Sequence, residues 1–147
     1  MRFSQSIIAA GCAVVLASSA TGLAQDPKVA ASDVAVTVTY KGAGTVDREH
    51  KIWIFLFDNA EIGAGSMPVA TMALEKNGGT ATFKAVPVNP VYVAVAFDDR
   101  GTYEGTAGPP PPGTPVGIYR PKDAKTASPV KPGDAITITF DDTNRMQ

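Results

Sequence analysis

Two segments of the chain alternate strictly between apolar and polar side chains. In residues 33–41, one face carries Val34, Val36, Val38 and Tyr40, and the other carries Ala35, Thr37, Thr39 and Lys41. Residues 134–140 show the same alternation, with isoleucines on one face and threonines on the other. Because successive side chains of a β-strand point to opposite faces, a period of two predicts strands with one buried face.

Two further segments, 51–57 and 91–97, are apolar on both faces. A soluble helix of this length would carry a polar face, so the pattern favours strands that are covered on both sides. We expect 51–57 to lie in the middle of the core.

A turn is expected at Asn77-Gly78, between residues 68–76 and 79–86. Asn and Gly tolerate the positive φ of a tight primed turn, which makes this pair a strong hairpin pattern. The sequence therefore predicts that these two segments form one β-hairpin.

Residues 101–133 differ in composition from the rest of the chain. They contain eight of the 12 prolines, including the run 109–112, and six of the 14 glycines. The proline run predicts extended polyproline II structure, and the apolar residues at 116–119 suggest a short edge strand or a segment that docks on the domain. A loop of this length in a small domain is often functional or disordered.

These patterns predict an all-β protein: an antiparallel β-sandwich of about seven strands, with the long Pro/Gly-rich loop before the last strand. The expected organisation is a flexible lead at 25–32, a sandwich domain at 33–141 and a polar tail at 142–147.

The first 24 residues have the pattern of a signal peptide. Arg2 precedes an uncharged, largely apolar stretch at 7–17, and small residues follow up to Ala24. A stretch of this length fits a signal core of roughly 7–15 residues and falls short of the roughly 18 of a membrane span. Cleavage before Cys12, as in a lipoprotein, would leave too few apolar residues upstream. We therefore expect a periplasmic or secreted protein with no transmembrane segment after cleavage.

Composition excludes several classes of function. The chain has 147 residues, 44% hydrophobic and 18% charged, with a net charge of -1, so it lacks the basic excess of a nucleic-acid binder. Its single cysteine excludes a disulfide framework and a Cys-rich zinc site. His50 is the only histidine and lies in the charged run 47–51, most simply a solvated connection. We expect no enzyme activity and no cofactor.

The order of segments resembles that of bacterial exported prealbumin-like domains, which include transthyretin-like and carboxypeptidase-regulatory-like modules. The resemblance covers nearly the whole mature chain and rests on an opening strand ending in Gly, an aromatic-rich strand, a strand pair with an Asn-Gly turn, a Val-Pro and Tyr strand, a Gly-Tyr segment and a last strand: 36–42, 52–58, 79–83, 86–98, 115–119 and 136–140. It implies a β-sandwich with a structural or binding role, of the kind that occurs in uncharacterised single-domain secreted families.

Acidic residues at the expected strand ends suggest a calcium site. Calcium needs six to eight oxygen ligands, and loop carboxylates supply them if the strand ends meet at one pole of the sandwich. The candidate ligands are Asp58, Asp98, Asp99 and Glu104. The alternative is that these are solvated loop acids. Many of the resembled domains have an acidic loop at 98–105, where this sequence carries Arg100 and Tyr103 instead.

Four residues of the Pro/Gly-rich region are candidates for ligand binding. Tyr103 and Tyr119 could grip a carbohydrate or another small ligand, and Pro110 and Pro111 could dock in an aromatic groove of a partner. The alternative for the proline run is a stiff spacer or a loop draped over the sandwich.

A soft copper site is a further alternative. It would combine His50 with Met67, Met72 and Met146, although Met72 is better explained as a core residue.

Three functions from different classes remain. The favoured one is a non-enzymatic exported binding or structural protein of the bacterial envelope that contacts an envelope protein or polysaccharide through 101–121. The second is a small-ligand or carbohydrate-binding module, or a calcium-binding sandwich. The third is a hydrolase, for which Asp98 and Glu104 would be the only candidate carboxylate pair.

Overall fold

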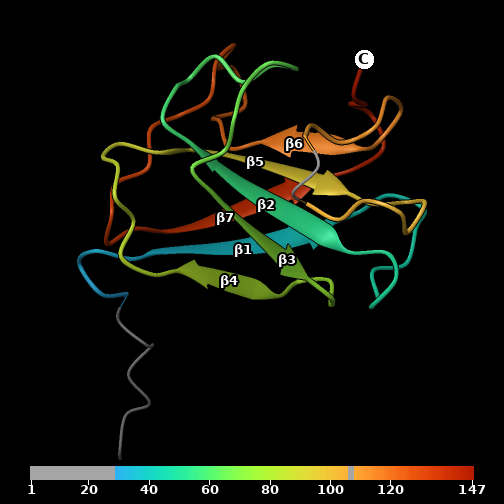
Figure 1. Cartoon of the computed structure of the whole chain (residues 1–147), viewed down its shortest axis with the longest axis horizontal. Helices are drawn as coiled ribbons and strands as arrows, with labels where there is room; N and C mark the ends of the chain where they lie inside the picture. Colours follow the sequence, from blue (N-terminus) through green and yellow to red (C-terminus); the bar gives the residue numbers. More distant parts are fainter. Residues whose placement is uncertain (1–28, 106–107) are drawn as a thin grey trace, which may run out of the picture.

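The computed structural model describes residues 29–105 and 108–147 (Figure 1). The expected signal peptide at 1–24 and the first part of the lead at 25–32 lie outside the described residues.

Seven strands and no helix make up the regular structure of these two ranges. None of the described residues forms a helix that could cross a membrane. The strands are β1 (Val34–Tyr40), β2 (Ile52–Phe57), β3 (Ala70–Leu74), β4 (Thr80–Phe83), β5 (Tyr92–Phe97), β6 (Val116–Ile118) and β7 (Ala135–Phe140). They form a three-stranded sheet, β4-β1-β7, and a four-stranded sheet, β3-β2-β5-β6. The prediction of an all-β sandwich of about seven strands is confirmed.

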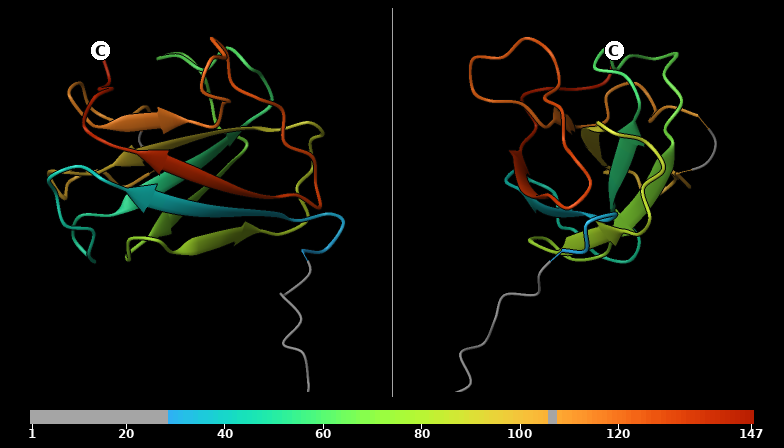
Figure 2. Two further views of the ribbon diagram at one scale, coloured as in Figure 1. Left: turned by 180° about the vertical axis from the view of Figure 1, so that it is seen from behind. Right: turned by 90° about the vertical axis from the view of Figure 1, so that its left-hand side faces the viewer.

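The two sheets lie face to face. The four-stranded sheet faces the viewer in Figure 1. The left view of Figure 2, taken from behind, has the three-stranded sheet in front. The central core fills the space between them. Its fully buried side chains alternate along β1, β2 and β5: Val34, Val36, Val38, Ile52, Ile54, Leu56, Val93, Val95 and Phe97. The alternation in 33–41 therefore predicted the buried face of β1 correctly.

The prediction that every strand pair is antiparallel is wrong at one place. β1 pairs with β7 in parallel, with Val36 opposite Ile136 and Val38 opposite Ile138. A hairpin forces two strands to be antiparallel, but β1 and β7 are joined by nearly the whole domain, which lets β7 enter the sheet from the same end as β1. All pairs in the four-stranded sheet are antiparallel.

The predicted hairpin at Asn77-Gly78 is also wrong. β3 pairs with β2, whereas β4 pairs with β1, so the turn carries the chain from one sheet to the other. The Asn77 side chain accepts a hydrogen bond from the Tyr40 amide at 2.8 Å and donates one to the Tyr40 carbonyl at 2.8 Å. Gly78 has φ +74°, as the turn pattern requires. The local turn chemistry is present, but the Asn side chain bonds to β1 instead of closing a β3–β4 pair.

The last residues of the chain extend the fold beyond Phe140. The amide of Val116 donates to the Asn144 carbonyl at 2.9 Å, and the amide of Met146 donates to the Thr114 carbonyl at 2.8 Å. The segment expected as a polar tail, 142–147, is thus paired with the chain that leads into β6.

Candidate functional site

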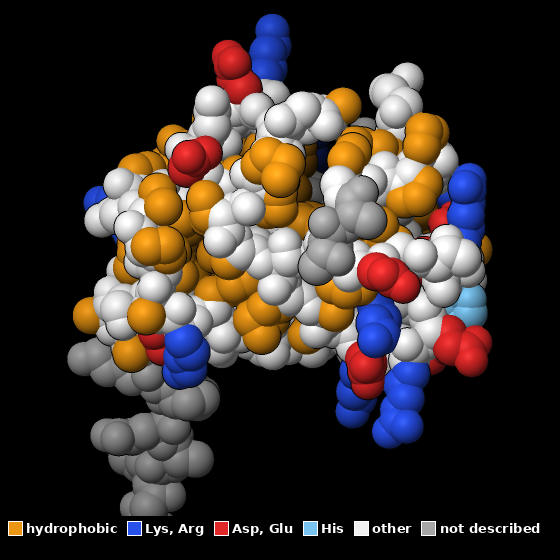
Figure 3. Space-filling view, in the orientation of Figure 1, with side chains coloured by type: hydrophobic (Ala, Val, Ile, Leu, Met, Phe, Trp, Pro, Cys, Tyr) orange, Lys and Arg blue, Asp and Glu red, His pale blue; other side chains and the backbone are white. Residues whose placement is uncertain are grey.

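The outer face of the four-stranded sheet is apolar, although it has no second sheet to cover it. β2 contributes Trp53, Phe55 and Phe57 to this face, and β5 contributes Ala94 and Ala96. Such a face is usually polar when it meets solvent. Figure 3 shows apolar side chains gathered over the sheet on the side turned to the viewer.

Loops cover this face only in part. Ile62, from the loop between β2 and β3, and Tyr103, from the segment between β5 and β6, pack against it. Between them remains a cavity of about 380 Å³, which we call the outer-face cavity. Its lining comes from β2, β3, β5, β6, both loops and the chain end: Phe55, Phe57, Ile62, Gly63, Ser66, Met67, Pro68, Thr71, Ala94, Val95, Ala96, Gly105, Gly108, Pro109, Pro110, Val116, Gly117, Ile118 and Met146. The volume is within the range of pockets that hold small molecules.

None of the described residues that line the outer-face cavity has a charged side chain. The described lining residues contribute two hydroxyls, those of Ser66 and Thr71. The Ser66 hydroxyl accepts a hydrogen bond from the Gly63 amide at 2.9 Å and donates one to the Glu61 carbonyl at 3.2 Å, so it holds its own loop. The cavity therefore favours apolar contents.

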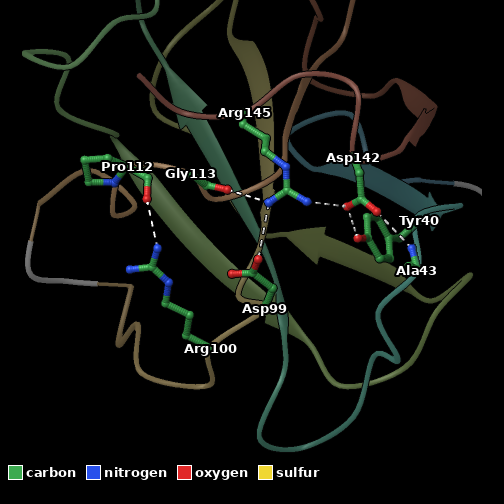
Figure 4. Close-up of polar contacts among 8 residues, drawn as sticks. All are labelled: Tyr40, Ala43, Asp99, Arg100, Pro112, Gly113, Asp142 and Arg145. Carbon is green, nitrogen blue, oxygen red and sulfur yellow. Dashed lines mark hydrogen bonds and ion pairs between the residues drawn. The ribbon is translucent and has the colours of Figure 1, made fainter.

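Residues 108–113, which we call the proline tract, lie at the edge of the cavity. Three side chains donate hydrogen bonds to backbone carbonyls of this segment. The Tyr103 hydroxyl donates to the Gly108 carbonyl at 2.6 Å. Arg100 donates to the Pro112 carbonyl at 3.2 Å, and Arg145 donates to the Gly113 carbonyl at 2.6 Å (Figure 4). Because prolines lack amide hydrogens, the backbone of the four prolines can only accept hydrogen bonds, and these side chains supply donors to Pro112 and to the two flanking glycines.

The chain from Tyr103 to Gly105, which leads into the proline tract and forms one wall of the cavity, packs on Trp53 of β2. Tyr103 lies edge-on to its ring, with a centroid distance of 5.5 Å. Gly105 has φ +74°, and a Cβ at this position would lie 2.1 Å from Trp53 Cζ3, so only glycine permits the approach. Trp53 Nε1 is buried and has no hydrogen-bond partner among the residues that the structure describes. Burial also raises the pKa of Tyr103. The wall is thus packed onto the sheet by aromatic contact.

Arg145 joins the proline tract to the sandwich. It pairs with Asp99 at 3.4 Å and with Asp142 at 3.3 Å, and Asp142 in turn accepts hydrogen bonds from the Tyr40 hydroxyl and the Ala43 amide (Figure 4). Burial, and then the Asp142 carboxylate, raises the pKa of Tyr40 to about 12. The same hydrogen bond lowers the pKa of Asp142. This network fastens the end of β1, the loop after β5 and the chain end together.

The two predicted ligand-binding tyrosines do not share a site. Tyr103 packs on the outer face of the four-stranded sheet, whereas Tyr119 packs on the core between the sheets. The idea of a carbohydrate platform built from both is therefore wrong, because a sheet separates them. Pro110 lines the outer-face cavity, while the carbonyl of Pro111 accepts a turn hydrogen bond from the Thr114 amide at 3.2 Å.

The predicted calcium site is not formed. Asp58 follows β2 and Asp98 follows β5, and these strands are antiparallel, with Phe57 opposite Tyr92. The two acids therefore lie at opposite ends of the sheet, about 20 Å apart at ~3.3 Å per residue. Asp98 is 5% exposed and accepts a hydrogen bond from the Tyr103 amide at 2.8 Å.

The other two predicted calcium ligands, Asp99 and Glu104, lie in different environments. Asp99 pairs with Arg145, and the exposed Glu104 lines a polar crevice with His50. Among the described residues, no group of three His, Cys, Asp or Glu side chains is placed to hold a metal ion.

The copper alternative is also not supported by the placement of its residues. Met67 and Met146 line the outer-face cavity, while His50 lies in the polar crevice and contacts Asp47 at 3.1 Å. Met72, expected in the core, is 37% exposed, because the edge strand β3 leaves it partly uncovered.

The outer-face cavity was not predicted as a site from the sequence. The pattern that could have pointed to it is the apolar character of both faces of β2 and β5, which indicated a covered face. What covers that face depends on the packing of two distant loops.

No family model, no curated protein and no solved structure matches the chain.

Proposed function

We propose that the protein is an exported, non-enzymatic binding protein whose site is the outer-face cavity. One observation carries this: an apolar cavity of about 380 Å³, whose described lining residues are all uncharged, lies between the proline tract and the sheet. The expectation that binding involves the Pro/Gly-rich region is kept, but the binding surface becomes the inner side of the proline tract rather than its exposed side.

The cavity chemistry supports binding over catalysis. General acid–base catalysis requires a titratable group within hydrogen-bond reach of the substrate. The lining residues include no His, Cys, Asp, Glu or Lys, and the Ser66 hydroxyl is engaged by its own loop. An apolar group entering the cavity gains about 25 cal/mol for each Å² of apolar surface removed from water.

Export and family type belong to the same proposal. The signal-peptide pattern of residues 1–24 supports a periplasmic or secreted location in the bacterial envelope. The seven strands in two sheets support the prealbumin-like type. N-terminal sequencing of the protein purified from its natural source tests export: a chain that begins near Gln25 is expected, and an intact Met1 would overturn it.

The methionines allow a direct test of the binding site. Met67 and Met146 line the cavity, and Met72 does not, so Met72 serves as an internal control. Isotope-labelled methionine methyl groups are observed by NMR while three probes are added in turn: 2-naphthylmethanol, 2-naphthoate and the peptide Leu-Leu-Leu amide. Saturable shifts of Met67 and Met146 with any probe, without a shift of Met72, support the proposal. If no probe moves these two methyl signals, the proposed binding function is wrong.

A further inference from the structure

The volume of the outer-face cavity limits the size of the ligand that it can hold. The volume of about 380 Å³ corresponds to about a dozen non-hydrogen atoms, if each atom takes about the 30 Å³ that a water molecule occupies in the liquid. A folded peptide segment or an oligosaccharide is larger than this. The size fits a small molecule of one or two rings, or a short alkyl chain.

The uncharged lining also limits the charge of the ligand. Placing an ionised group in an apolar site without a partner is very costly. Two cations contact the proline tract, and neither is among the lining residues of the cavity. Arg100 donates to the Pro112 carbonyl, and Arg145 donates to the Gly113 carbonyl and pairs with Asp99 and Asp142. A carboxylate or an ammonium group inside the cavity would therefore find no counter-charge among its lining residues.

The arrangement of side chains indicates the shape of the ligand. Ala94 and Ala96 are small side chains side by side on β5, opposite Phe55 and Trp53 of the neighbouring β2. The rings of Phe55 and Phe57 line the cavity beside them. A floor of small side chains beside aromatic rings suits a flat apolar molecule. Thr71, on the other side of β2, supplies a hydroxyl that can bond one polar group of it.

Resting on the proposed function, we infer that the outer-face cavity binds a flat, uncharged, apolar small molecule of about a dozen non-hydrogen atoms that carries at most one hydroxyl or carbonyl group. The occupant is a free small molecule and not a segment of a partner protein.

The matched probes test this inference. 2-Naphthylmethanol and 2-naphthoate share one ring system and nearly one size, but only the second is charged at neutral pH. The inference expects saturable binding of the alcohol at Met67 and Met146 and at least about tenfold weaker binding of the carboxylate and of Leu-Leu-Leu amide. Equal or stronger binding of the carboxylate or the peptide would overturn it, while the proposed binding function would stand.

Filling the cavity provides a second test. Ala94→Leu adds three carbon atoms, or roughly 90 Å³ at the same volume per atom, to a cavity of about 380 Å³. Binding of 2-naphthylmethanol should weaken at least about tenfold, whereas the matched variant Thr137→Leu, exposed on β7 of the other sheet, should bind as the wild type does.

Thr71→Phe fills the cavity from the edge strand β3 and keeps the test open if Ala94→Leu does not fold. Both variants are checked for folding by circular dichroism before binding is measured. Unchanged binding in a folded variant of either kind would place the ligand elsewhere and overturn the inference.

Discussion

Replacing Gly105 by alanine should separate the proline tract from the sheet. Gly105 has φ +74°, and a Cβ would lie 2.1 Å from Trp53 Cζ3. Holding alanine in the left-handed region costs about 1–2 kcal/mol. Relieving the overlap costs about 1–3 kcal/mol more, and the reduced freedom of the unfolded chain returns about 0.4–1 kcal/mol. The free energy of unfolding should therefore fall by about 2–4 kcal/mol.

Gly63→Ala is the matched control. Gly63 lies in the other loop of the cavity, has no atom within 4 Å of its would-be Cβ, and its φ is outside the left-handed region. Its substitution should change the free energy of unfolding by no more than about 0.5 kcal/mol. The two variants differ in the backbone φ at the substituted position and in whether the added methyl group meets the sheet.

Trp53 reports the outcome, because it is the only tryptophan of the chain. Urea unfolding is followed by tryptophan fluorescence and by circular dichroism. In Gly105→Ala the emission of the folded state should move to longer wavelength, because the lifted chain admits water to the indole. If Gly105→Ala unfolds at the same urea concentration as Gly63→Ala, with unshifted emission, the packing of this wall on Trp53 is refuted.

Three further predictions concern the polar contacts around the sandwich. Because the pKa of Tyr40 is raised to about 12, stability should fall as the pH rises from about 10 to about 12, and Tyr40→Phe should show a smaller fall in thermal unfolding. Because the hydrogen bond from Lys84 lowers the pKa of Asp33, stability should fall as the pH drops through and below 3.8, and urea unfolding of Asp33→Asn should lack that part of the fall. Deleting residues 142–147 removes backbone pairing with the chain before β6, so the thermal midpoint should drop, whereas loss of a free tail would leave it unchanged.

Local patterns predicted the strands well and their neighbours poorly. The alternation of Val34, Val36 and Val38 is set by burial of one face, which is a property of the strand itself. The partner of a strand depends on the whole chain. Asn77-Gly78 has the chemistry of a hairpin turn, yet its neighbours belong to different sheets, because Asn77 bonds to Tyr40 of β1. The parallel pairing of β1 with β7 is non-local in the same way.

The candidate site shows the same limit. The apolar character of both faces of β2 and β5 predicted that the sheet would be covered, and loops do cover it in part. The clustering of Asp58 with Asp98 required the ends of two strands to meet, and their antiparallel pairing places them at opposite ends. Tyr103 and Tyr119 are close in the sequence but on opposite faces of one sheet. Residues that alternate between faces can be assigned only when the path of the chain between them is known.

The parallel pairing of β1 with β7 affects how the protein folds. β1 is the first strand of the domain and β7 is the last, and each β1 residue from Ala35 to Tyr40 has its partner in β7. Contacts between such distant parts of a chain close slowly, because a long loop must be ordered before they form. During synthesis β1 therefore has only β4 as a sheet neighbour until β7 has been made. The three-stranded sheet is completed only after nearly the whole domain has been synthesised.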